Sequence, residues 1–164
     1  MSITSDRIEQ HIDVAAPRAR VWRALSDVRE FAHWFGLAFD GPFQEGAHRA
    51  GTFVGSAVDL EVGAAQRVHA GRTFDILIER VEPERRLSFR WHPFAVDPAV
   101  DYASEPTTLV EFMLDDVPGG TRVTVIESGF EALPAARRPD AFSANSQGWP
   151  IMIGVLGRYV GDAA

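Results

Sequence analysis

The chain has 164 residues, of which 16 are basic and 23 acidic, giving a net charge of −7 and no cysteine. This length suits one domain with its own core, and we predict a single domain over residues 1–164. An acidic chain lacks the positive surface that phosphate backbones require, so no nucleic-acid partner is expected. Without cysteine there is no disulfide or thiolate metal site, and without lysine no Schiff-base catalysis.

The N-terminal segment is polar and has no apolar signal core. Asp6, Arg7 and Glu9 fall within residues 1–14, and no apolar run of 18 residues occurs in the sequence. We therefore predict no membrane insertion and a cytoplasmic location.

The first elements are a strand and two short helices. Ile8, Ile12 and Val14 alternate with charged residues, which predicts a strand. Ala16-Pro17 ends this strand, since proline suits the first turn of a helix. Two helices follow, with Asp27 as the expected cap of the second. Their apolar positions are Val21, Trp22, Leu25 and Val28, then Phe31, Trp34 and Phe35.

The middle of the chain is expected to be loops and strands. Residues 37–51 are predicted to form a loop and residues 52–62 one or two strands. Two alternating segments then predict a β-hairpin around the turn 82–84. Their apolar faces are Phe74, Ile76 and Ile78 on one arm, and Leu87, Phe89 and Trp91 on the other. The connector 93–106 holds three prolines, and a connector this long is often functional or mobile.

The last part of the sequence predicts two strands and one long helix. Residues 107–114 and 121–128 read as strands joined by the turn 118–120. The apolar positions from Phe142 to Val160 recur at helical spacing, and Pro150 within them predicts a kink or a helix start. The whole pattern predicts an α+β fold. Its sheet of about six or seven curved antiparallel strands wraps around the C-terminal helix.

Several motifs resemble the SRPBCC superfamily, and most of all its branch homologous to the activator of heat-shock-protein-90 ATPase. They are Ile12-Asp13-Val14-Ala15-Ala16-Pro17, Val21-Trp22-Arg23-Ala24-Leu25, Trp34-Phe35-Gly36, Val81-Glu82-Pro83-Glu84-Arg85, Phe89-Arg90-Trp91, Glu127-Ser128-Gly129-Phe130 and Gly148-Trp149-Pro150. The resemblance covers roughly residues 7–160. It implies a START-like helix-grip fold with a cavity between the sheet and the last helix. Members of the superfamily include binders of lipids and small hydrophobes, polyketide aromatases and cyclases, and co-chaperone domains.

Aromatic residues are the first candidates for a ligand site, because ligand pockets are mainly apolar with a few polar groups. The predicted ligand-binding set is Trp34, Phe35, Phe53, Phe74, Trp91, Phe112, Glu127, Phe130, Trp149 and Ile153. Trp34, Trp91 and Trp149 lead it, since each sits on an element expected to border the cavity. The alternative is that these side chains simply fill the core.

Glu127 is the polar candidate of most interest. It shares the alternation of Val123 and Val125, so it should lie on their face of the strand. If that face is internal, the carboxylate is a candidate general acid or base. The alternatives are an ion pair with an arginine such as Arg90, or a surface position at the sheet edge.

No metal or cofactor is expected. The five histidines show no H-x-x-x-H or H-E-x-x-H spacing, and the chain has no G-x-G-x-x-G motif. His33 adjoins Trp34 and is a possible polar group near the cavity. His92 should face away from Trp91 in a regular strand, which favours a surface role.

Three functions remain open. The first is binding of a small hydrophobic molecule, oriented by Glu127 with His33 or Arg90. The second is an aromatase- or cyclase-like enzyme that uses a cavity carboxylate. The third is a chaperone-partner module, which needs an exposed apolar patch on the outer sheet face. Charges expected on that face, Asp75, Glu79 and Arg90, argue against the third. A homodimer, and a role of 93–106 as a flap over the cavity, stay open.

Overall fold

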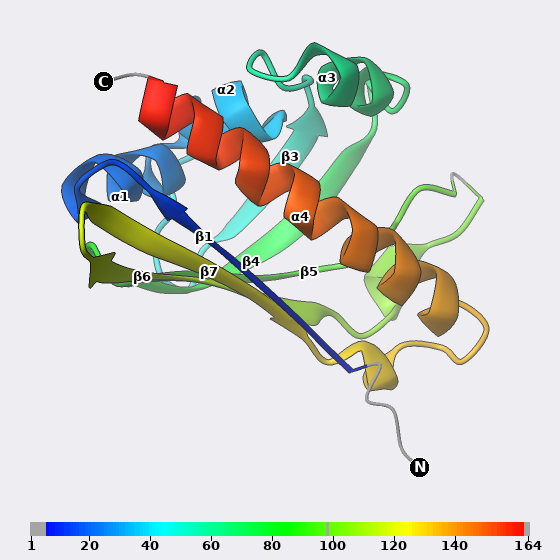
Figure 1. Ribbon diagram of the computed structural model, residues 1–164. Coiled ribbons are helices and arrows are strands. Elements are labelled where there is room, and N and C mark those ends of the chain that lie inside the picture. The colour runs from blue at the N-terminus through cyan, green and yellow to red at the C-terminus, as the bar shows by residue number, and fades with distance from the viewer. Residues whose placement is uncertain (1–5, 98, 163–164) are drawn as a thin grey trace.

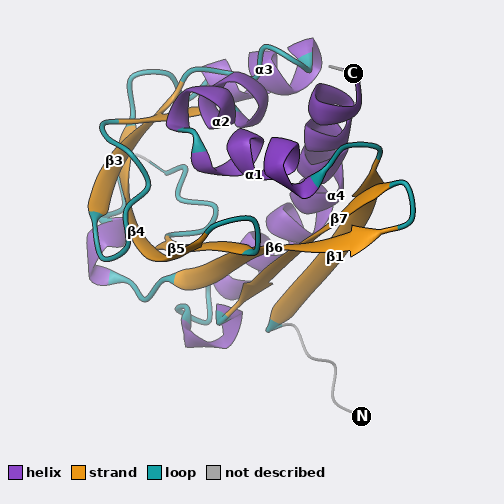
Figure 2. Cartoon of the chain, turned by 90° about the vertical axis from the view of Figure 1, so that its left-hand side faces the viewer, coloured by secondary structure: helices purple, strands orange, loops and turns teal. Residues whose placement is uncertain are grey.

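A curved antiparallel sheet grips one long helix. The computed structural model describes residues 6–97 and 99–162. Its seven strands follow the order β1-β7-β6-β5-β4-β3-β2. Helix α4 lies across the sheet (Figure 1), and the sheet curves around the side that carries α1, α2 and α4 (Figure 2). This is the predicted helix-grip α+β architecture. Residues 1–5 of the polar N-terminal segment and Pro98 of the connector lie outside the described residues.

The strands are β1 Arg7–Val14, β2 Leu37–Phe39, β3 His48–Phe53, β4 Thr73–Glu82, β5 Arg86–Trp91, β6 Thr108–Val117 and β7 Gly120–Ser128. The helices are α1 Arg18–Ser26, α2 Val28–Phe35, α3 Leu60–Arg67 and α4 Arg138–Asp162. Two short 3-10 turns, Tyr102–Ser104 and Phe130–Ala132, precede β6 and α4.

The two N-terminal helices form as predicted. Pro17 stands at the N-cap of α1, and the Asp27 side chain accepts from the backbone N–H groups of Arg29 and Glu30 at the start of α2. Gly36 ends α2 with φ of 89°, and a Cβ there would lie 2.1 Å from Gln66 Oε1. Glycine is therefore required where α2 turns into β2.

Two predictions for residues 37–62 are wrong. The expected loop 37–51 contains β2 and most of β3, and the expected strand 52–62 ends at Phe53 and is followed by α3. Asp59 caps α3 by accepting from the N–H groups of Glu61 and Val62. This local cap, followed by the good helix formers Ala64 and Ala65, outweighs the strand-like alternation around it.

The predicted hairpins are confirmed. Strand β4 pairs with β5 around the turn at Glu82, and β6 pairs with β7 with Val117 opposite Gly120. A Cβ on Gly120 would lie 1.8 Å from the carbonyl oxygen of Val14, so glycine lets this turn approach the end of β1.

Helix α4 passes through Pro150 without ending there, so Pro150 is not the helix start that the sequence suggested. Pro150 lies on the exposed side of the helix. Proline has no N–H to donate to the carbonyl one turn earlier, and water can bond to that carbonyl instead. Other residues of α4 are buried in the core, among them Trp149, Ile153, Leu156 and Val160.

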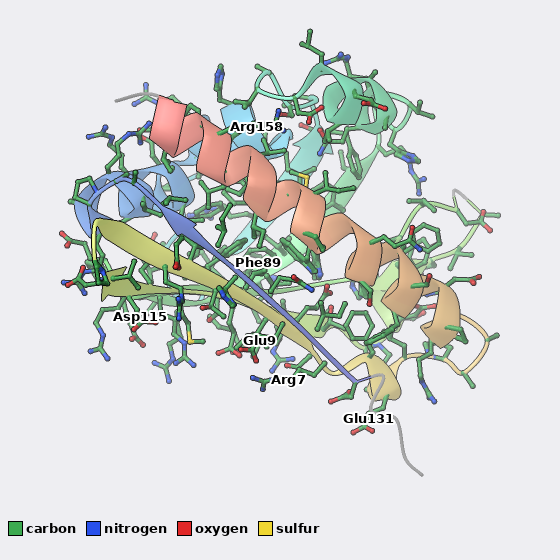
Figure 3. All side chains as sticks on the ribbon, in the orientation of Figure 1. Arg7, Glu9, Phe89, Asp115, Glu131 and Arg158 are labelled. Carbon is green, nitrogen blue, oxygen red and sulfur yellow. The ribbon has the colours of Figure 1, made fainter. Side chains whose placement is uncertain are left out.

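The core lies between the sheet and α4, where Phe89 is seen in Figure 3. The other face of the sheet is polar, and Figure 3 shows Arg7 and Glu9 on the side away from α4. Ion pairs cross its strands, among them Arg122 with Asp13 at 2.8 Å and Arg86 with Glu111 at 2.6 Å.

Candidate functional site: a buried carboxylate beside an apolar pocket

Glu127 lies inside the protein. Its exposed fraction is 0%, equal to that of Val123 and Val125 on the same face of β7. The predicted alternation is therefore confirmed, and the alternative of a surface position is wrong. A carboxylate so deeply buried is costly unless other groups satisfy its oxygens.

Four side chains satisfy Glu127. The indole N–H groups of Trp91 and Trp149 donate to Oε2 and Oε1, each at 2.8 Å. Thr108 Oγ1 lies 2.6 Å from Oε2, and Asn145 Nδ2 lies 2.8 Å from Oε1. Each oxygen thus has two partners, which matches the acceptor capacity of a carboxylate.

Strand register and helix spacing bring these groups together. Trp91 of β5 is paired with Thr108 of β6, and Glu127 of β7 is paired with Val110, two residues further along β6. All of these side chains share one face of the sheet because residues two apart point the same way. Asn145 and Trp149 are four residues apart on α4, so they project from one side of the helix onto Glu127.

No cation compensates Glu127 among the described ion pairs. Arg90, the partner that the sequence suggested, instead forms an ion pair with Glu79 of β4. Arg90 follows Phe89 in β5 and faces the opposite side of the sheet from Glu127. The alternative of a Glu127–Arg90 ion pair is therefore wrong, and neutral donors hold the carboxylate.

An apolar pocket of about 170 Å³ adjoins this cluster. Its walls come from α2, β2, β3, α3, β4, β5, the connector and α4. They are formed by Phe35, Leu37, Phe53, Gln66, Phe74, Trp91, His92, Phe94, Ala95, Val96 and Asn145.

A second hollow of about 150 Å³ shares part of that wall and adds Gly148, Trp149 and Met152 of α4. The shared residues are Phe35, Gln66, Trp91 and Asn145. The two hollows are therefore neighbours.

The predicted ligand-binding residues fall into three groups. Phe35, Phe53, Phe74, Trp91 and Trp149 line one or both hollows. Glu127 lies behind their wall, where it bonds to Trp91 and Trp149.

The third group is buried in the core: Trp34, Phe112, Phe130 and Ile153. The Trp34 indole donates to the Ala24 carbonyl at 2.8 Å, which ties α2 to α1. Phe112 packs edge-on against Trp149, and Phe130 against Phe142. His33 also lies apart from the two hollows, with its ring 5.4 Å from that of Tyr159.

His92 corrects another prediction. It follows the last residue of β5, lines the pocket together with Trp91, and is only partly exposed, so the expected surface role is wrong. The strand ends at Trp91, so strict alternation no longer decides where His92 points. Burial lowers the pKa of His92 from its ordinary value of 6.5, against the opposing pull of the Glu105 carboxylate.

Gln66 and Asn145 are pocket residues that sequence reasoning missed. Gln66 sits on α3, a helix whose first residues were expected to be strand, and it donates to the Phe35 carbonyl at 2.6 Å. Asn145 could have been found from its position four residues before Trp149, which places both on one face of the helix.

The connector 93–106 forms one wall of the pocket through Phe94, Ala95 and Val96. Arg137 binds it from the segment before α4, donating to the carbonyls of Pro93 at 2.9 Å and Phe94 at 3.1 Å. The same guanidinium bonds Glu105 at 2.8 Å and lies 4.8 Å from the ring centre of Tyr102. Arg72 contacts the carbonyls of Ala95 and Val96 from the other side.

No group of three or more histidine, aspartate or glutamate residues suited to holding a metal ion occurs within residues 6–97 and 99–162. Over the same described residues, no helix is both long and apolar enough to cross a bilayer.

The seven-stranded sheet curved around the long C-terminal helix defines a protein of the helix-grip, SRPBCC type. Residues 15–161 match the family described as activator of Hsp90 ATPase homolog 1-like protein. The chain therefore belongs to this family, as the sequence motifs indicated. Comparison with curated proteins gave no match.

Solved structures of the same fold include two proteins named DynU16 and CalU16. DynU16, from the dynemicin biosynthetic locus, is 28% identical with a TM-score of 0.68, over 94% of this chain and 47% of DynU16. The chain thus spans about half the length of DynU16. CalU16 from Micromonospora echinospora is 19% identical with a TM-score of 0.62, over 98% of this chain and 81% of CalU16.

Protein MLL2253 from Mesorhizobium loti is similar over nearly its whole length. It is 22% identical with a TM-score of 0.69, over 96% of this chain and 98% of MLL2253. At 22% identity, this similarity shows a shared fold and no more.

Proposed function

We propose that this protein binds a small hydrophobic molecule in the pocket between α4 and the sheet. One observation carries the proposal: a buried carboxylate without a cation fixes three residues, Trp91, Asn145 and Trp149, that line the hollows beside it. Burying Glu127 costs free energy that an ordinary apolar core would avoid. A binding function accounts for this cost, because Glu127 then holds the three side chains in one arrangement for a ligand.

The size of the pocket limits the ligand. Its volume of about 170 Å³ lies below the roughly 300–1,000 Å³ of pockets for drug-sized molecules. A ligand of one or two rings, or of similar bulk, suits this space better than a long acyl chain. Binding would be driven by removal of apolar ligand surface from water.

A cyclase-like enzyme that uses the Glu127 carboxylate is the second candidate. It is favoured by the burial of that carboxylate, and by similarity to DynU16, a protein of the dynemicin biosynthetic locus. Proton transfer requires direct contact with the substrate or one intervening water. Both Glu127 oxygens already bond to two donors each, and the residue lies behind the pocket wall. These contacts favour a positioning role over a catalytic one.

A chaperone partner, as the family description suggests, is a weaker proposal. The outer face of the sheet carries the ion pairs of Asp13 with Arg122 and Glu111 with Arg86. Such a face offers polar contacts instead of the apolar patch typical of protein docking.

Native mass spectrometry tests the proposal. The protein is purified from its own host, and a second sample is incubated with an organic extract of host cells. We expect a stoichiometric added mass that is released by denaturation and belongs to a compact, mostly apolar molecule. An unchanged protein mass in both samples would contradict the binding function.

A further inference from the structure

The orientation of one amide in the pocket wall is fixed. Asn145 Nδ2 donates to Glu127 Oε1 at 2.8 Å, and a carboxylate oxygen that already accepts from Trp149 requires the amide NH₂ on that side. Asn145 Oδ1 consequently lies on the other side of the amide. It accepts no hydrogen bond from the described part of the chain, although Asn145 lines both hollows. In the pocket wall, Asn145 Oδ1 is therefore a hydrogen-bond acceptor to which no described group donates.

His92 adds an uncharged ring to the same wall. Its Nδ1 is buried and has no partner among the described residues. Burial lowers the pKa of the ring, so the imidazole is neutral at neutral pH and keeps one unprotonated nitrogen. A neutral ring adds no positive charge to the pocket wall.

The charges around the pocket disfavour anions. None of the described side chains that line the two hollows is an arginine. The nearby Arg72 and Arg137 are engaged with carbonyl groups of the connector. The Glu127 carboxylate stands directly behind the wall. A carboxylate ligand would be buried here without a counter-charge, which is costly.

We propose that the pocket selects uncharged ligands that carry a hydrogen-bond donor, such as a hydroxyl on an aromatic ring, with Asn145 Oδ1 as the acceptor. The inference rests on the proposed binding function and narrows its ligand class. Glu127 acts here as a positioning residue, since its bond to Nδ2 decides which end of the amide meets the ligand.

Three probes of nearly equal shape test this selection: ethylbenzene, 4-ethylphenol and 4-ethylbenzoate. Binding is followed at neutral pH by NMR titration of the indole N–H signals, to which Trp91 and Trp149 contribute. One added hydrogen bond should make 4-ethylphenol bind about threefold to tenfold tighter than ethylbenzene. The ionised 4-ethylbenzoate should bind most weakly of the three.

Two variants assign the effect to Asn145. Asn145→Leu should reduce the preference for 4-ethylphenol over ethylbenzene to about onefold, because the acceptor is gone. Thr108→Val is the matched control. It also removes a donor to Glu127, but Thr108 is buried and lines neither described hollow, so the preference should persist.

The outcomes separate this inference from the binding function. Equal affinity for ethylbenzene and 4-ethylphenol, or tightest binding of 4-ethylbenzoate, would overturn the inference and leave a hydrophobic pocket in place. Loss of the preference in Thr108→Val as well as Asn145→Leu would overturn the role of Asn145. Failure of all three probes to bind the wild-type protein would contradict the binding function itself. The wild-type comparison decides the ligand class even if a variant does not fold.

Discussion

Trp91 of β5 and Trp149 of α4 donate to opposite oxygens of one buried carboxylate, and their rings stack with centres 5.9 Å apart and planes 29° apart. The pair joins the sheet to the C-terminal helix at the edge of the pocket. Both rings lose freedom to rotate, because each indole N–H has one fixed acceptor. Glu127 thereby sets the shape of the wall without itself lining either described hollow.

Replacing Glu127 by leucine should destabilise the protein strongly. The change removes four hydrogen bonds and leaves buried N–H donors of Trp149 and its neighbours unsatisfied, at about 1–3 kcal/mol for each orphaned group. We expect a loss of about 3 kcal/mol or more in the free energy of unfolding, measured with urea.

Glu9→Ala serves as the control for that measurement, since Glu9 forms an exposed ion pair with Arg7. Its loss should change the free energy of unfolding by about 0–1 kcal/mol. Equal, small effects of the two substitutions would show that the Glu127 cluster does not support the fold.

Arg137→Ala should loosen the connector 93–106 while leaving the core intact. Arg137 bonds the carbonyls of Pro93 and Phe94 and the carboxylate of Glu105, so its loss frees one wall of the pocket. Hydrogen exchange measured by mass spectrometry should become faster in peptides from this connector and stay unchanged in β6 and β7.

The neighbouring Arg138→Ala is the matched control for the connector. Arg138 donates to the carbonyls of Glu131 and Leu133, which lie outside the connector. Faster exchange of residues 93–106 in Arg138→Ala, or unchanged exchange in Arg137→Ala, would contradict the proposed fixing of the pocket wall.

His92 should contribute to a loss of stability on acidification. Its pKa in the folded protein is lowered, chiefly by burial, from an ordinary value of 6.5, so the unfolded chain binds the proton more readily. Stability should thus begin to fall as the pH drops through the unfolded pKa and stop falling below the folded pKa.

Urea midpoints at about pH 7.5 and about pH 5, on either side of the ordinary histidine pKa, measure this effect. His92→Gln should lose less stability than the wild type between the two conditions. His11→Gln, at an exposed position of β1, should behave as the wild type does. An equal acid loss in wild type and His92→Gln would rule out this role of His92.

Two glycines of α4 should respond differently to alanine. A Cβ on Gly154 meets nothing within 4 Å, whereas one on Gly157 would lie 2.8 Å from Ile12 Cδ1 of β1. Gly154→Ala should raise the free energy of unfolding by about 0.5–1 kcal/mol through helix propensity. Gly157→Ala should raise the free energy of unfolding by less, because the Ile12 side chain must move to make room for the Cβ. An equal gain in both variants, measured by urea unfolding, would contradict the close approach of α4 to β1.

The sequence was most informative where periodicity and local caps agree. The alternation of Val123, Val125 and Glu127 correctly placed a carboxylate inside the sheet, and Asp27 correctly marked the start of α2. The same kind of cap at Asp59 was overlooked because the residues around it also alternate like a strand. Short windows of this kind fit either structure, and tertiary packing decides between them.

The partners of Glu127 could not be read from the sequence in the same way. Thr108 and Trp91 meet it only through the register of three strands, and Asn145 only through the seating of α4 on the sheet. The sequence suggested Arg90, which has a suitable charge but lies on the other face of β5. The face of the strand on which a side chain lies is thus a better guide to its hydrogen-bond partner than its charge.

The most direct measurement of the central claim is native mass spectrometry of the protein from its host with the pocket filled by mutation. Ala95 of the connector lines the pocket, so Ala95→Leu should occupy part of that space. Ala99→Leu, at an exposed position of the same connector and outside both hollows, is the control. We predict a bound small molecule on the wild type and Ala99→Leu and its loss from Ala95→Leu. A ligand retained equally by all three proteins, or absent from the wild type, would contradict binding in this pocket.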